Sequence, residues 1–443
     1  MSRDLANWIC EALRRNGQQA LLAGGCVRDL LLGREPADYD VATEATPDQV
    51  LALFPRGIAV GARFGVVIVP EGEDKVEVAT FRSDVGYSDG RHPDQVRFAR
   101  TPEEDVRRRD FTINGLLMRA DSGEVLDFVG GQADLRAHLV RAVGDPDRRF
   151  AEDKLRMMRA VRFAARFNYA IEPSTLSAIR AHAPQIVQVS RERVRDECTK
   201  ILTEGAARHG FELLDETGLL GLVLPEVAAM RGVPQPPQFH PEGDVWIHTR
   251  LMLDKLPAGC SHTLAWGVLL HDVGKPPTFK QPISPDDRIR FDGHVEIGVR
   301  MAEEICHRLR FSNDDTQQIL ALVANHMRFK DAVEMRLSTL KRLVRQPRFE
   351  EHLELHRLDC LSSHGNLDTY SFVQNFLRDT PPEKVRPPRL ITGDDLRGLG
   401  LSPGPQFREL LQAVEDAQLE GQVSDRSDAL ALVRRHLQER SHR

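Results

Sequence analysis

A stretch of seventeen residues, 24–40, constrains this chain more than any other part of its sequence. It opens on the glycine pair Gly24–Gly25 and closes on two aspartates separated by one tyrosine. The apolar run 20–23 precedes it and is long enough for a buried strand, and residues 27–33 are typical of the beginning of a helix. Because glycine lets backbone N–H groups approach an anion and a helix N-terminus favours phosphate, this turn predicts a phosphate site.

The two aspartates, Asp38 and Asp40, add a metal site to this prediction. Residues two apart in a strand point to the same side, so we expect both carboxylates to face one spot. Mg²⁺ takes oxygen ligands and shares them with substrate phosphates. An isolated Asp-x-Asp is usually a solvated turn, but with Arg28 nearby the whole stretch predicts a site for a nucleoside triphosphate in which two metal ions activate a hydroxyl.

The glycine-rich stretch is the first of four segments that occur in the order of one known family. The others are 108–115, 144–156 and 191–197. Their residues resemble those of the class II tRNA nucleotidyltransferases, which belong with the bacterial poly(A) polymerases to the DNA polymerase beta-like superfamily. The resemblance covers the first half of the chain, and it implies catalytic roles for Asp38 and Asp40.

The resemblance also implies a nucleotide site around two arginines. The Gly25 backbone and Arg28 would hold the triphosphate, and Arg109 would clamp phosphate or ribose, because a guanidinium pairs with phosphate oxygens in a fork. Asp110 belongs to this site by position, either as a ribose contact or as a support for the metals. An ion pair between Asp110 and Arg108 or Arg109 is the alternative.

Nucleotide choice is expected from Asp153 and Arg156, which the family uses as a protein template for CTP and ATP. On a helix these residues would be i, i+3 neighbours. A carboxylate accepts from an exocyclic amino group and a guanidinium donates to a ring nitrogen or carbonyl, so the pair can accept C and A and reject U and G. Arg159, one turn further on, is a second basic contact. The alternative is a helix salt bridge.

Two segments of the head separate the branches of this family. Residues 81–98 resemble the flexible loop that helps to switch from C to A addition. Residues 60–65 correspond to a run in which poly(A) polymerases carry Gly-basic-basic-Phe, and here Ala62 replaces the first basic residue. This favours the tRNA branch, but the remaining Arg63–Phe64 keeps a poly(A) polymerase as an alternative.

A second metal site is predicted around His271–Asp272, which resembles the HD phosphohydrolase motif. Imidazole and carboxylate ligands suit Mn, Ni, Co or Fe, with Mg²⁺ as another choice, and one carboxylate can bridge two ions. The candidate ligands are His248, His271, Asp272 and Asp359, with His294 and His326 as further candidates. The resemblance implies 2′,3′-cyclic phosphodiesterase, 2′-nucleotidase or phosphatase activity. A metal held without catalysis is the alternative.

Length and patterning fit several domains, since 443 residues are typical of about three. Strand signals become scarce after about residue 146. We expect an α+β fold with a DNA polymerase beta-like nucleotidyltransferase α/β head, an all-helical neck and body, and a helical HD domain. The expected boundaries are head 1–145, neck and body 146–232, HD domain 233–380 and helical C-terminal tail 381–443.

Composition excludes several classes of protein. The net charge of −6 argues against indiscriminate coating of nucleic acid, but it allows a local basic groove. Basic residues gather in 141–166 and again in 341–348, where each cluster is either a nucleic-acid contact or a solvated helix face. Six scattered cysteines without a C-x-x-C pair fit a reducing cytosol, and no apolar run reaches transmembrane length.

These observations together predict a cytoplasmic, template-independent enzyme that adds C, C and A to the tRNA 3′ end. Its expected partners are the tRNA 3′ end, CTP and ATP, with Mg²⁺ in the head and no membrane or obligatory protein partner. An A-adding enzyme and a poly(A) polymerase are alternatives from the same family. A different class of alternative is an RNA-binding HD phosphohydrolase with an inactive head.

Overall fold

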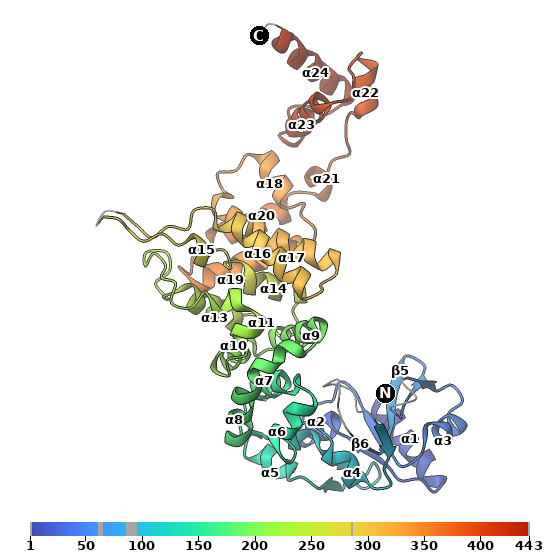
Figure 1. Ribbon diagram of the computed structural model, residues 1–443. Helices are drawn as coiled ribbons and strands as arrows, with labels where there is room; N and C mark the ends of the chain where they lie inside the picture. The colour runs from blue at the N-terminus through green and yellow to red at the C-terminus, as the bar shows by residue number, and fades with distance from the viewer. Residues whose placement is uncertain (1, 61–64, 86–94, 285–286, 442–443) are drawn as a thin grey trace. The chain divides into compact units, whose positions relative to one another are not determined.

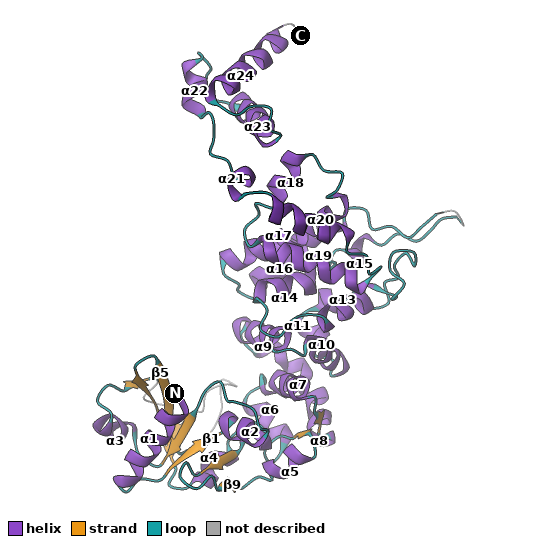
Figure 2. Ribbon diagram, turned by 180° about the vertical axis from the view of Figure 1, so that it is seen from behind, coloured by secondary structure: helices purple, strands orange, loops and turns teal. Residues whose placement is uncertain are grey.

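The computed structural model describes residues 2–60, 65–85, 95–284 and 287–441. The chain forms two compact units. Unit 1 comprises residues 1–229 with 256–260 and 308–310, and unit 2 comprises 230–255, 261–307 and 311–443. Every strand in the described ranges lies in unit 1, where Figure 2 shows the orange arrows, and unit 2 is helical.

A seven-stranded sheet organises the first part of unit 1 (Figure 1). Its strands are β1 (Ala20–Ala23), β2 (Asp40–Thr43), β3 (Ile58–Ala59), β4 (Val66–Glu71), β5 (Asp74–Thr80), β8 (Leu116–Met118) and β9 (Val125–Asp127). They follow the order β3-β4-β5-β2-β1-β8-β9, with β2 and β5 parallel and the other neighbours antiparallel. The strand predicted at 20–23 is therefore confirmed as β1.

Helices and a separate two-stranded hairpin accompany this sheet. They are α1 (Ser2–Arg15), α2 (Gly25–Leu31), α3 (Pro47–Leu53), α4 (Pro102–Arg107), η2 (Thr112–Asn114) and α5 (Gly131–Arg136), with the hairpin β6 (Arg82–Val85) and β7 (Gln95–Phe98). The amphipathic α1 packs on β1 and β5 and buries Leu5, Ile9 and Leu13. Helix α2 begins at Gly25, two residues before the predicted start.

The rest of unit 1 is helical, as expected from the change in periodicity near residue 146. Its helices are α6 (Pro146–Glu152), α7 (Arg156–Phe167), α8 (Pro173–His182), η3 (Ala183–Gln188), α9 (Arg191–Thr203), α10 (Ala207–Glu216), α11 (Leu220–Val223) and α12 (Pro225–Ala228). The small strands β10 (Leu139–Val140) and β11 (Ala170–Ile171) pair in parallel beside them. Helix α7 packs against α9 and α10 and carries the basic residues of 156–166.

Unit 2 is built around one helix that is buried on all sides. Helix α14 (His262–Leu270) buries every residue from Thr263 onward, and Ser261 caps it by accepting from the Leu264 N–H. The other helices are α13 (Val245–Asp254), α15 (Lys275–Thr278), α16 (His294–Arg308), α17 (Asn313–Asn325), η4 (His326–Asp331), α18 (Leu337–Leu343), α19 (Phe349–Ser362) and α20 (Asp368–Asp379). Helices α13, α17 and α19 all pack on α14.

The C-terminal helices have an apolar cluster of their own. They are α21 (Pro382–Val385), α22 (Gly393–Gly398), α23 (Pro405–Leu419) and α24 (Arg426–Ser441), and Leu396, Leu410 and Val433 belong to the cluster. The basic cluster 341–348 has intramolecular partners here: Lys341 donates to the Leu419 carbonyl at 2.7 Å. Its other members pair with acidic residues: Arg342 with Asp416, Arg345 with Glu415, and Arg348 with Asp314.

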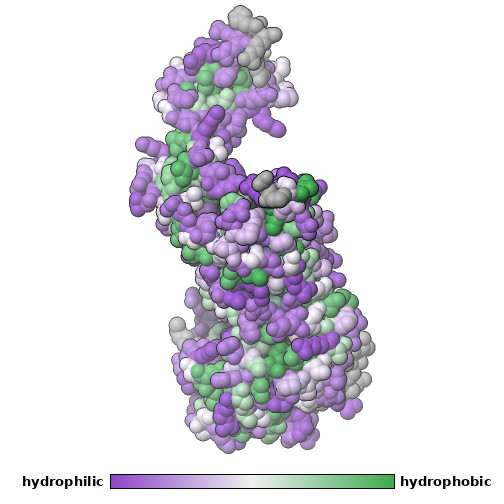
Figure 3. All heavy atoms as spheres, turned by 90° about the vertical axis from the view of Figure 1, so that its left-hand side faces the viewer, coloured by the Kyte–Doolittle hydropathy of each residue, from purple (hydrophilic) through white to green (hydrophobic). Residues whose placement is uncertain are grey.

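The surface of the chain mixes polar and apolar side chains. Figure 3 shows hydrophilic residues interspersed with small hydrophobic patches over one face. Among the helices of the described ranges, none combines the length and the apolar character that a bilayer-spanning segment requires.

Candidate functional site

A pocket of about 680 Å³ in unit 1 gathers every residue predicted for the nucleotide site. The predicted residues that line it are Gly25, Arg28, Asp38, Asp40, Arg109, Asp110, Asp153, Arg156 and Arg159. The lining contains eight arginines and four aspartates, so this pocket is basic although the whole chain is acidic. Such a pocket concentrates polyanions such as nucleotides and RNA ends.

The turn between β1 and α2 approaches Arg109 closely. Gly24 has a φ of 73°, a conformation that favours glycine, and a Cβ at this position would lie 2.7 Å from Nη1 of Arg109. The Gly24 N–H donates to the Leu116 carbonyl at 2.9 Å, which fixes the turn to β8. Both a left-handed backbone and lack of space therefore require glycine here.

Arg28 is buried and held from several sides. Its Nε donates to Asp29 Oδ1 at 2.8 Å, and its Nη1 donates to Asn114 Oδ1 at 2.5 Å. The guanidinium carbon lies 4.6 Å from the ring centroid of Phe167. These contacts orient the cation before any ligand binds.

Asp38 and Asp40 line the pocket together, although only the second lies in a strand. Strand β2 begins at Asp40, so the prediction of one strand through both aspartates is wrong. Burial nevertheless alternates along this segment, because Tyr39 is buried and Asp38 and Asp40 on either side of it are exposed. Partial burial and the carboxylate of Glu77 raise the pKa of Asp40 to about 6, against the opposing charge of Arg109.

These carboxylates fit a hard cation. Throughout the described ranges, neither Asp38 nor Asp40 forms an ion pair through its side chain, and the donors are all oxygen, the type that Mg²⁺ prefers. Glu77 is a third carboxylate that the sequence interpretation missed. It pairs with Asp40 in the parallel register of β2 and β5, which is a long-range relation that no local motif signals.

Asp110 is tied to Arg159 and not to its sequence neighbours. Arg159 Nε donates to Asp110 Oδ2 at 2.8 Å, and Asn114 Nδ2 donates to Oδ1 at 3.1 Å. Burial raises the pKa of Asp110, but Arg159 and the Asn114 hydrogen bond outweigh burial and hold it at about 2. Asn114 thus connects Arg28 to Asp110, a role that the sequence interpretation did not anticipate.

The alternative partners considered for Asp110 pair with a different carboxylate. Arg108 and Arg109 both contact the buried Asp105, at 2.8 and 3.0 Å. Arg109 also donates from Nη1 to the Asn114 carbonyl at 3.3 Å, and its buried Nε has no hydrogen-bond partner in the part of the chain that is described. Arg109 therefore lines the pocket with a guanidinium that Asp105 and the Asn114 carbonyl hold in place.

The prediction that Asp153 and Arg156 share one helix is wrong. Helix α6 ends at Glu152, Asp153 has an extended backbone, and α7 begins at Arg156. Asp153 Oδ1 accepts from the Leu155 N–H at 3.0 Å, which stabilises this break between the helices. The break turns the Asp153 side chain toward α9 and not along α7.

Each member of this pair has a separate anchor. Both carboxylate oxygens of Asp153 accept from Arg193, at 3.2 and 2.7 Å. Arg156 Nη1 donates to Glu152 Oε2 at 2.7 Å and to the Arg149 carbonyl at 3.0 Å. The salt-bridge alternative is therefore right about the presence of ion pairs but not about the partners, and both groups still line the pocket.

Two segments distinguish the branches of this family, and their central residues lie outside the described ranges. Residues 86–94 of the predicted flexible loop are not described, but its ends form the antiparallel hairpin of β6 and β7. Ala62 and the neighbouring Arg63–Phe64 are also outside the described ranges.

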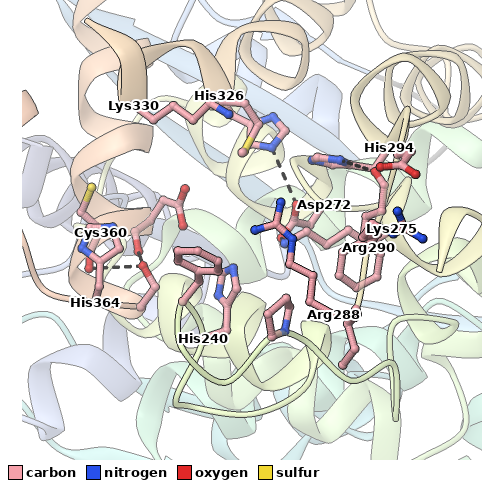
Figure 4. A pocket seen from close by; sticks show the side chains of 18 of the residues that line it. His240, Asp272, Lys275, Arg288, Arg290, His294, His326, Lys330, Cys360 and His364 are labelled. Carbon is pink, nitrogen blue, oxygen red and sulfur yellow. Dashed lines mark hydrogen bonds and ion pairs between the residues drawn. The ribbon is translucent and has the colours of Figure 1, made fainter. Parts of the chain in front are cut away.

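The second candidate site gathers all six predicted HD residues in unit 2. Three groups of side chains have ligand atoms within 4.8 Å of one another: His248, His271 and Asp359; Asp272, His294 and His326; and His240, Glu242 and His248. They come from α13, α16, α19, the C-terminal ends of α14 and α17, and the loop before α13, which carries His240 and Glu242. Figure 4 shows Asp272, His294 and His326 around one pocket.

The histidines of this cluster present the same nitrogen inward. Nδ1 of His271, His294 and His326 contacts the carbonyl of Val268, Phe291 and Val323 respectively, at 2.7–2.9 Å. Nε2 of each is buried and makes no hydrogen bond within the described ranges, and the same is true of Asp272 Oδ1. Buried polar atoms without partners are costly unless something binds them, so this donor set fits a divalent metal.

Asp272 occupies the centre of the cluster. Its Oδ2 lies 3.1 Å from His271 Nε2, and its Oδ1 lies 3.7 Å from His326 Nε2. Burial raises the pKa of Asp272, but His271 and Lys275 outweigh burial and lower it well below the usual value. The carboxylate is therefore ionised and has one oxygen directed at each half of the cluster, as a bridging ligand requires.

His248 has an acidic partner that the sequence interpretation missed. Glu242 Oε1 contacts Nδ1 of His248 at 2.7 Å and Nδ1 of His240 at 2.8 Å. Nε2 of His248 then faces Asp359 Oδ1 at 3.2 Å. A carboxylate behind a ligating histidine fixes its orientation and raises its basicity, and only the fold brings the loop residue Glu242 to α13.

One buried histidine of unit 2, His352, belongs to none of these three groups. His352 on α19 is buried, and its Nε2 has no hydrogen-bond partner in the described part of the chain. Burial lowers the pKa of His352 from 6.5 to about 4, with Glu351 opposing. This histidine is therefore neutral in the folded protein.

His352→Leu is expected to reduce the acid sensitivity of the fold. Between pH 6.5 and 4 the unfolded chain binds a proton at His352 that the folded chain does not, so stability falls as pH falls through this window. This lowering of the pKa corresponds to about 3 kcal/mol of stability at pH 4. The Tm, measured from pH 7.5 to 4.5, should fall less in His352→Leu than in the wild type or in the exposed-site control His307→Leu. An unchanged pH dependence would contradict this account of His352.

Three family descriptions match consecutive parts of the chain. "Poly A polymerase head domain" matches residues 20–141, "Probable RNA and SrmB- binding site of polymerase A" matches 168–231, and "HD domain" matches 244–360. The head sheet, its pocket and the helical HD cluster thus define a nucleotidyltransferase-type head followed by an HD domain, as the sequence resemblance implied.

Curated relatives and a solved structure identify the family more narrowly. The CCA-adding enzyme of Levilactobacillus brevis is 45% identical over 216 residues, covering 49% of this chain and 54% of that protein. The CCA-adding enzyme of Latilactobacillus sakei is 39% identical over 270 residues, covering 60% and 68%. The crystal structure of the Bacillus stearothermophilus CCA-adding enzyme in complex with CTP matches with a TM-score of 0.75 and 26% identity, covering 99% and 98%.

The chain belongs to the family of the CCA-adding enzymes, the tRNA nucleotidyltransferases of the poly(A) polymerase type. The aligned part spans about half the length of several of the curated relatives, for example 54% of the Levilactobacillus brevis protein and 52% of a Geobacillus thermodenitrificans protein.

Proposed function

We propose that this protein adds C, C and A to the 3′ end of tRNA with CTP and ATP as donors and without a nucleic-acid template. The observation that carries this proposal is the basic pocket that Asp38 and Asp40 line together with Asp153 and Arg156. Relatives that bear the name CCA-adding enzyme, one of them solved with CTP, support it.

The reaction is an attack of the terminal ribose hydroxyl on the α-phosphate of the incoming nucleotide, with pyrophosphate leaving. Asp38 and Asp40 would hold two Mg²⁺ ions, which supply charge neutralisation and activation of the hydroxyl when bound. The Gly25 backbone and Arg28 would receive the triphosphate. Arg109, which lines the same pocket, would bind phosphate or ribose.

Base choice would come from Asp153 and Arg156. The carboxylate accepts from the exocyclic amino group of C or A, and the guanidinium donates to a ring nitrogen or carbonyl. U and G present the wrong edges to this pair. Glu152 holds Arg156, and Asp110 holds Arg159 beside it, so both donors are oriented by buried carboxylates. The test is incorporation with Mg²⁺ and each of the four nucleoside triphosphates separately: only CTP and ATP should be used.

Arg193→Ala is expected to lower kcat/KM for CTP and ATP by about 10²-fold, because Asp153 loses the guanidinium that fixes both of its oxygens and misplacement of a binding group by about 1 Å costs this much. We also expect the preference for CTP over UTP to fall, which loss of stability alone would not cause. Single-turnover kinetics with each nucleotide measure both effects.

Arg191→Ala is the matched control, since Arg191 lies on the same helix but does not line the pocket. Arg193→Lys, which restores the charge without the bidentate geometry, should recover part of the preference. If Arg193→Ala lowers kcat/KM equally for all four nucleotides, or for none of them, Arg193 does not position Asp153.

We further propose metal-dependent phosphohydrolase activity in the HD part of the chain, of the 2′,3′-cyclic phosphodiesterase, 2′-nucleotidase or phosphatase type. His248, His271 and Asp359 would hold one metal ion and His294 and His326 a second, with Asp272 between them. Mn, Ni, Co, Fe and Mg are the candidates. The metals would supply activation of water when bound, and Glu242 would orient His248.

This second proposal has a direct test. The protein freed of metal and reloaded with each divalent ion is incubated with nucleoside 2′,3′-cyclic phosphates, 2′-nucleotides and a generic aryl phosphate. Hydrolysis that depends on the added ion supports a catalytic site. Stoichiometric metal without hydrolysis supports a structural one.

The proposed domain organisation is a head at 1–145, a neck and body at 146–232, an HD domain at 233–380 and a C-terminal tail at 381–443. We propose that the protein acts in the cytoplasm on the tRNA 3′ end. An A-adding enzyme or a poly(A) polymerase remains the nearest alternative from the same family. An RNA-binding hydrolase with an inactive head is the alternative of a different class, and the intact Asp38–Asp40 pair argues against it.

A further inference from the structure

The HD pocket is larger than one phosphate group needs. It encloses about 570 Å³, a size typical of sites for small organic ligands. The metal-ligand cluster occupies only one part of the lining, through Asp272, His294, His326 and Asp359. The remaining lining therefore determines which phosphoester can enter.

Two basic side chains of this lining form no close ion pair among the described residues, although one of them, Arg288, acts from a distance on the carboxylates of Asp287 and Asp292. Lys275 pairs with Asp272 at 2.7 Å and Arg290 lies 3.6 Å from Asp287. Arg288 and Lys330, in contrast, form no ion pair with any carboxylate of the described residues, and both are exposed at the pocket. Figure 4 shows them around the same pocket as His326 and Asp272. Their charges are available for an anion that the metal cluster does not bind.

The segment that carries Arg288 is anchored to the cluster. Arg290 and Lys280 form an antiparallel bridge, with backbone hydrogen bonds of 2.9 and 3.2 Å between them. The carbonyl of Phe291, the next residue, contacts Nδ1 of His294 at 2.9 Å. The arginine is thus held by backbone contacts near a candidate metal ligand, and it does not hang from an unattached loop.

The pocket lining also includes partly exposed apolar side chains. Phe239 lines it with half of its surface exposed, at 50%, and Met327 lines it at 36%. A half-exposed aromatic ring beside a phosphate site offers a surface on which a nucleobase can stack. The pocket therefore combines a metal-ligand cluster, an apolar face and a separate pair of cations.

We propose that the HD pocket is built for a nucleotide that carries a second phosphate group besides the one that is hydrolysed, and that Arg288 and Lys330 bind this second group while Phe239 stacks on the base. The proposal rests on the phosphohydrolase activity proposed above and specifies its substrate class. Hydrolysis would break one P–O ester bond with water, leave the alcohol protonated, and leave the second phosphate intact.

The first test compares adenosine 2′-monophosphate with adenosine 2′,5′-bisphosphate as substrates of the metal-loaded protein. We expect kcat/KM for the bisphosphate to be at least about tenfold higher, from two charge-assisted contacts. In Arg288→Ala/Lys330→Ala this preference should disappear, so that the ratio of the two kcat/KM values falls to about one. Arg300→Ala, an exposed arginine of α16 outside the pocket, should behave as the wild type. Equal rates in the wild type, or a preference that survives the double substitution, overturn the proposal.

The second test measures binding and needs no hydrolysis. Calorimetric titration of the metal-free protein with adenosine 2′,5′-bisphosphate should give a Kd at least about tenfold lower than in the double variant. Phe239→Ala should weaken binding of the bisphosphate more than binding of inorganic pyrophosphate. If the bisphosphate binds in this way but no phosphoester is hydrolysed, the phosphohydrolase proposal fails and the two-phosphate site stands. If wild type and double variant bind it equally, the two-phosphate site fails whatever the hydrolysis assay shows.

Discussion

Asp40→Ala is expected to lower nucleotide transfer by at least about 10³-fold, because loss of a metal-ion contribution to the transition state costs several kcal/mol. Asp40 opens β2, lines the pocket with Asp38, and forms no close ion pair with a described residue, although the charge of Arg109 acts on it from a distance. Removing its carboxylate leaves Asp38 alone to hold two ions, and neither binding of the triphosphate to Arg28 nor base selection replaces that role. Incorporation of labelled CTP into tRNA that ends before CCA measures the loss.

The same variant separates the two proposed sites. Hydrolysis in the HD pocket and the Tm should stay close to the wild-type values, since Asp40 lies in unit 1 and is exposed. Asp48→Ala, which removes an exposed carboxylate of α3 outside the pocket, should transfer nucleotides normally. Transfer by Asp40→Ala within tenfold of the wild type would show that the Asp38–Asp40 pair is not the metal site.

The second large effect is expected in the HD cluster. The combined substitution His271→Ala and Asp272→Ala removes one imidazole ligand and the central carboxylate, so bound metal and phosphoester hydrolysis should both fall to background. Nucleotide transfer should stay within twofold of the wild type. Metal content by mass spectrometry of the purified protein and the two activity assays give three independent readings.

Folding must be checked separately for this pair. Asp272 also neutralises the buried Lys275, and an unpaired buried charge destabilises a fold by several kcal/mol. Asp272→Asn keeps the shape of the side chain and isolates the loss of charge, and His307→Ala on α16 is a control at an exposed histidine. If the variants bind metal at the wild-type stoichiometry, the ligand assignment is wrong. If they lose transfer as well as hydrolysis while remaining folded, the two sites are not independent.

The parts of the head that could be predicted from sequence are those with local causes. The apolar run before Gly24, the glycine pair and the alternation through Asp38 and Asp40 depend on neighbours in sequence. In the structure the run forms the buried strand β1, and the glycine pair and both aspartates line one pocket. Periodicity likewise predicted the amphipathic α1 and the change to helices near residue 146. The order of histidines and aspartates similarly led to one cluster in unit 2.

The errors and omissions have long-range causes. The helix break at Asp153 depends on a carboxylate that bonds the Leu155 N–H and pairs with Arg193, forty residues later in the chain. Helical propensity of the flanking residues does not report such a contact. Glu77 and Glu242 were missed for the same reason: strand register brings one to Asp40, and a loop brings the other to His248.

The basic clusters show how the same sequence signal has two outcomes. Arginines of 156–166 line the head pocket, whereas those of 341–348 pair with acidic residues of α23 and with Asp314. Both clusters look alike in sequence, because the partners of the second cluster lie up to 78 residues away in the chain. A run of basic residues therefore indicates a nucleic-acid contact only where those residues are not already paired with acidic residues of the same chain.

The most direct test of the central claim is the length and sequence of the product. The protein is incubated with Mg²⁺, CTP and ATP on three RNAs: tRNA that ends before CCA, tRNA that ends in C-C, and an unrelated RNA. The account predicts that C, C and A are added to the first, that A alone is added to the second, that the unrelated RNA is not extended, and that addition then stops. Addition of A only to C-C ends, or long A tails on any RNA, would contradict it.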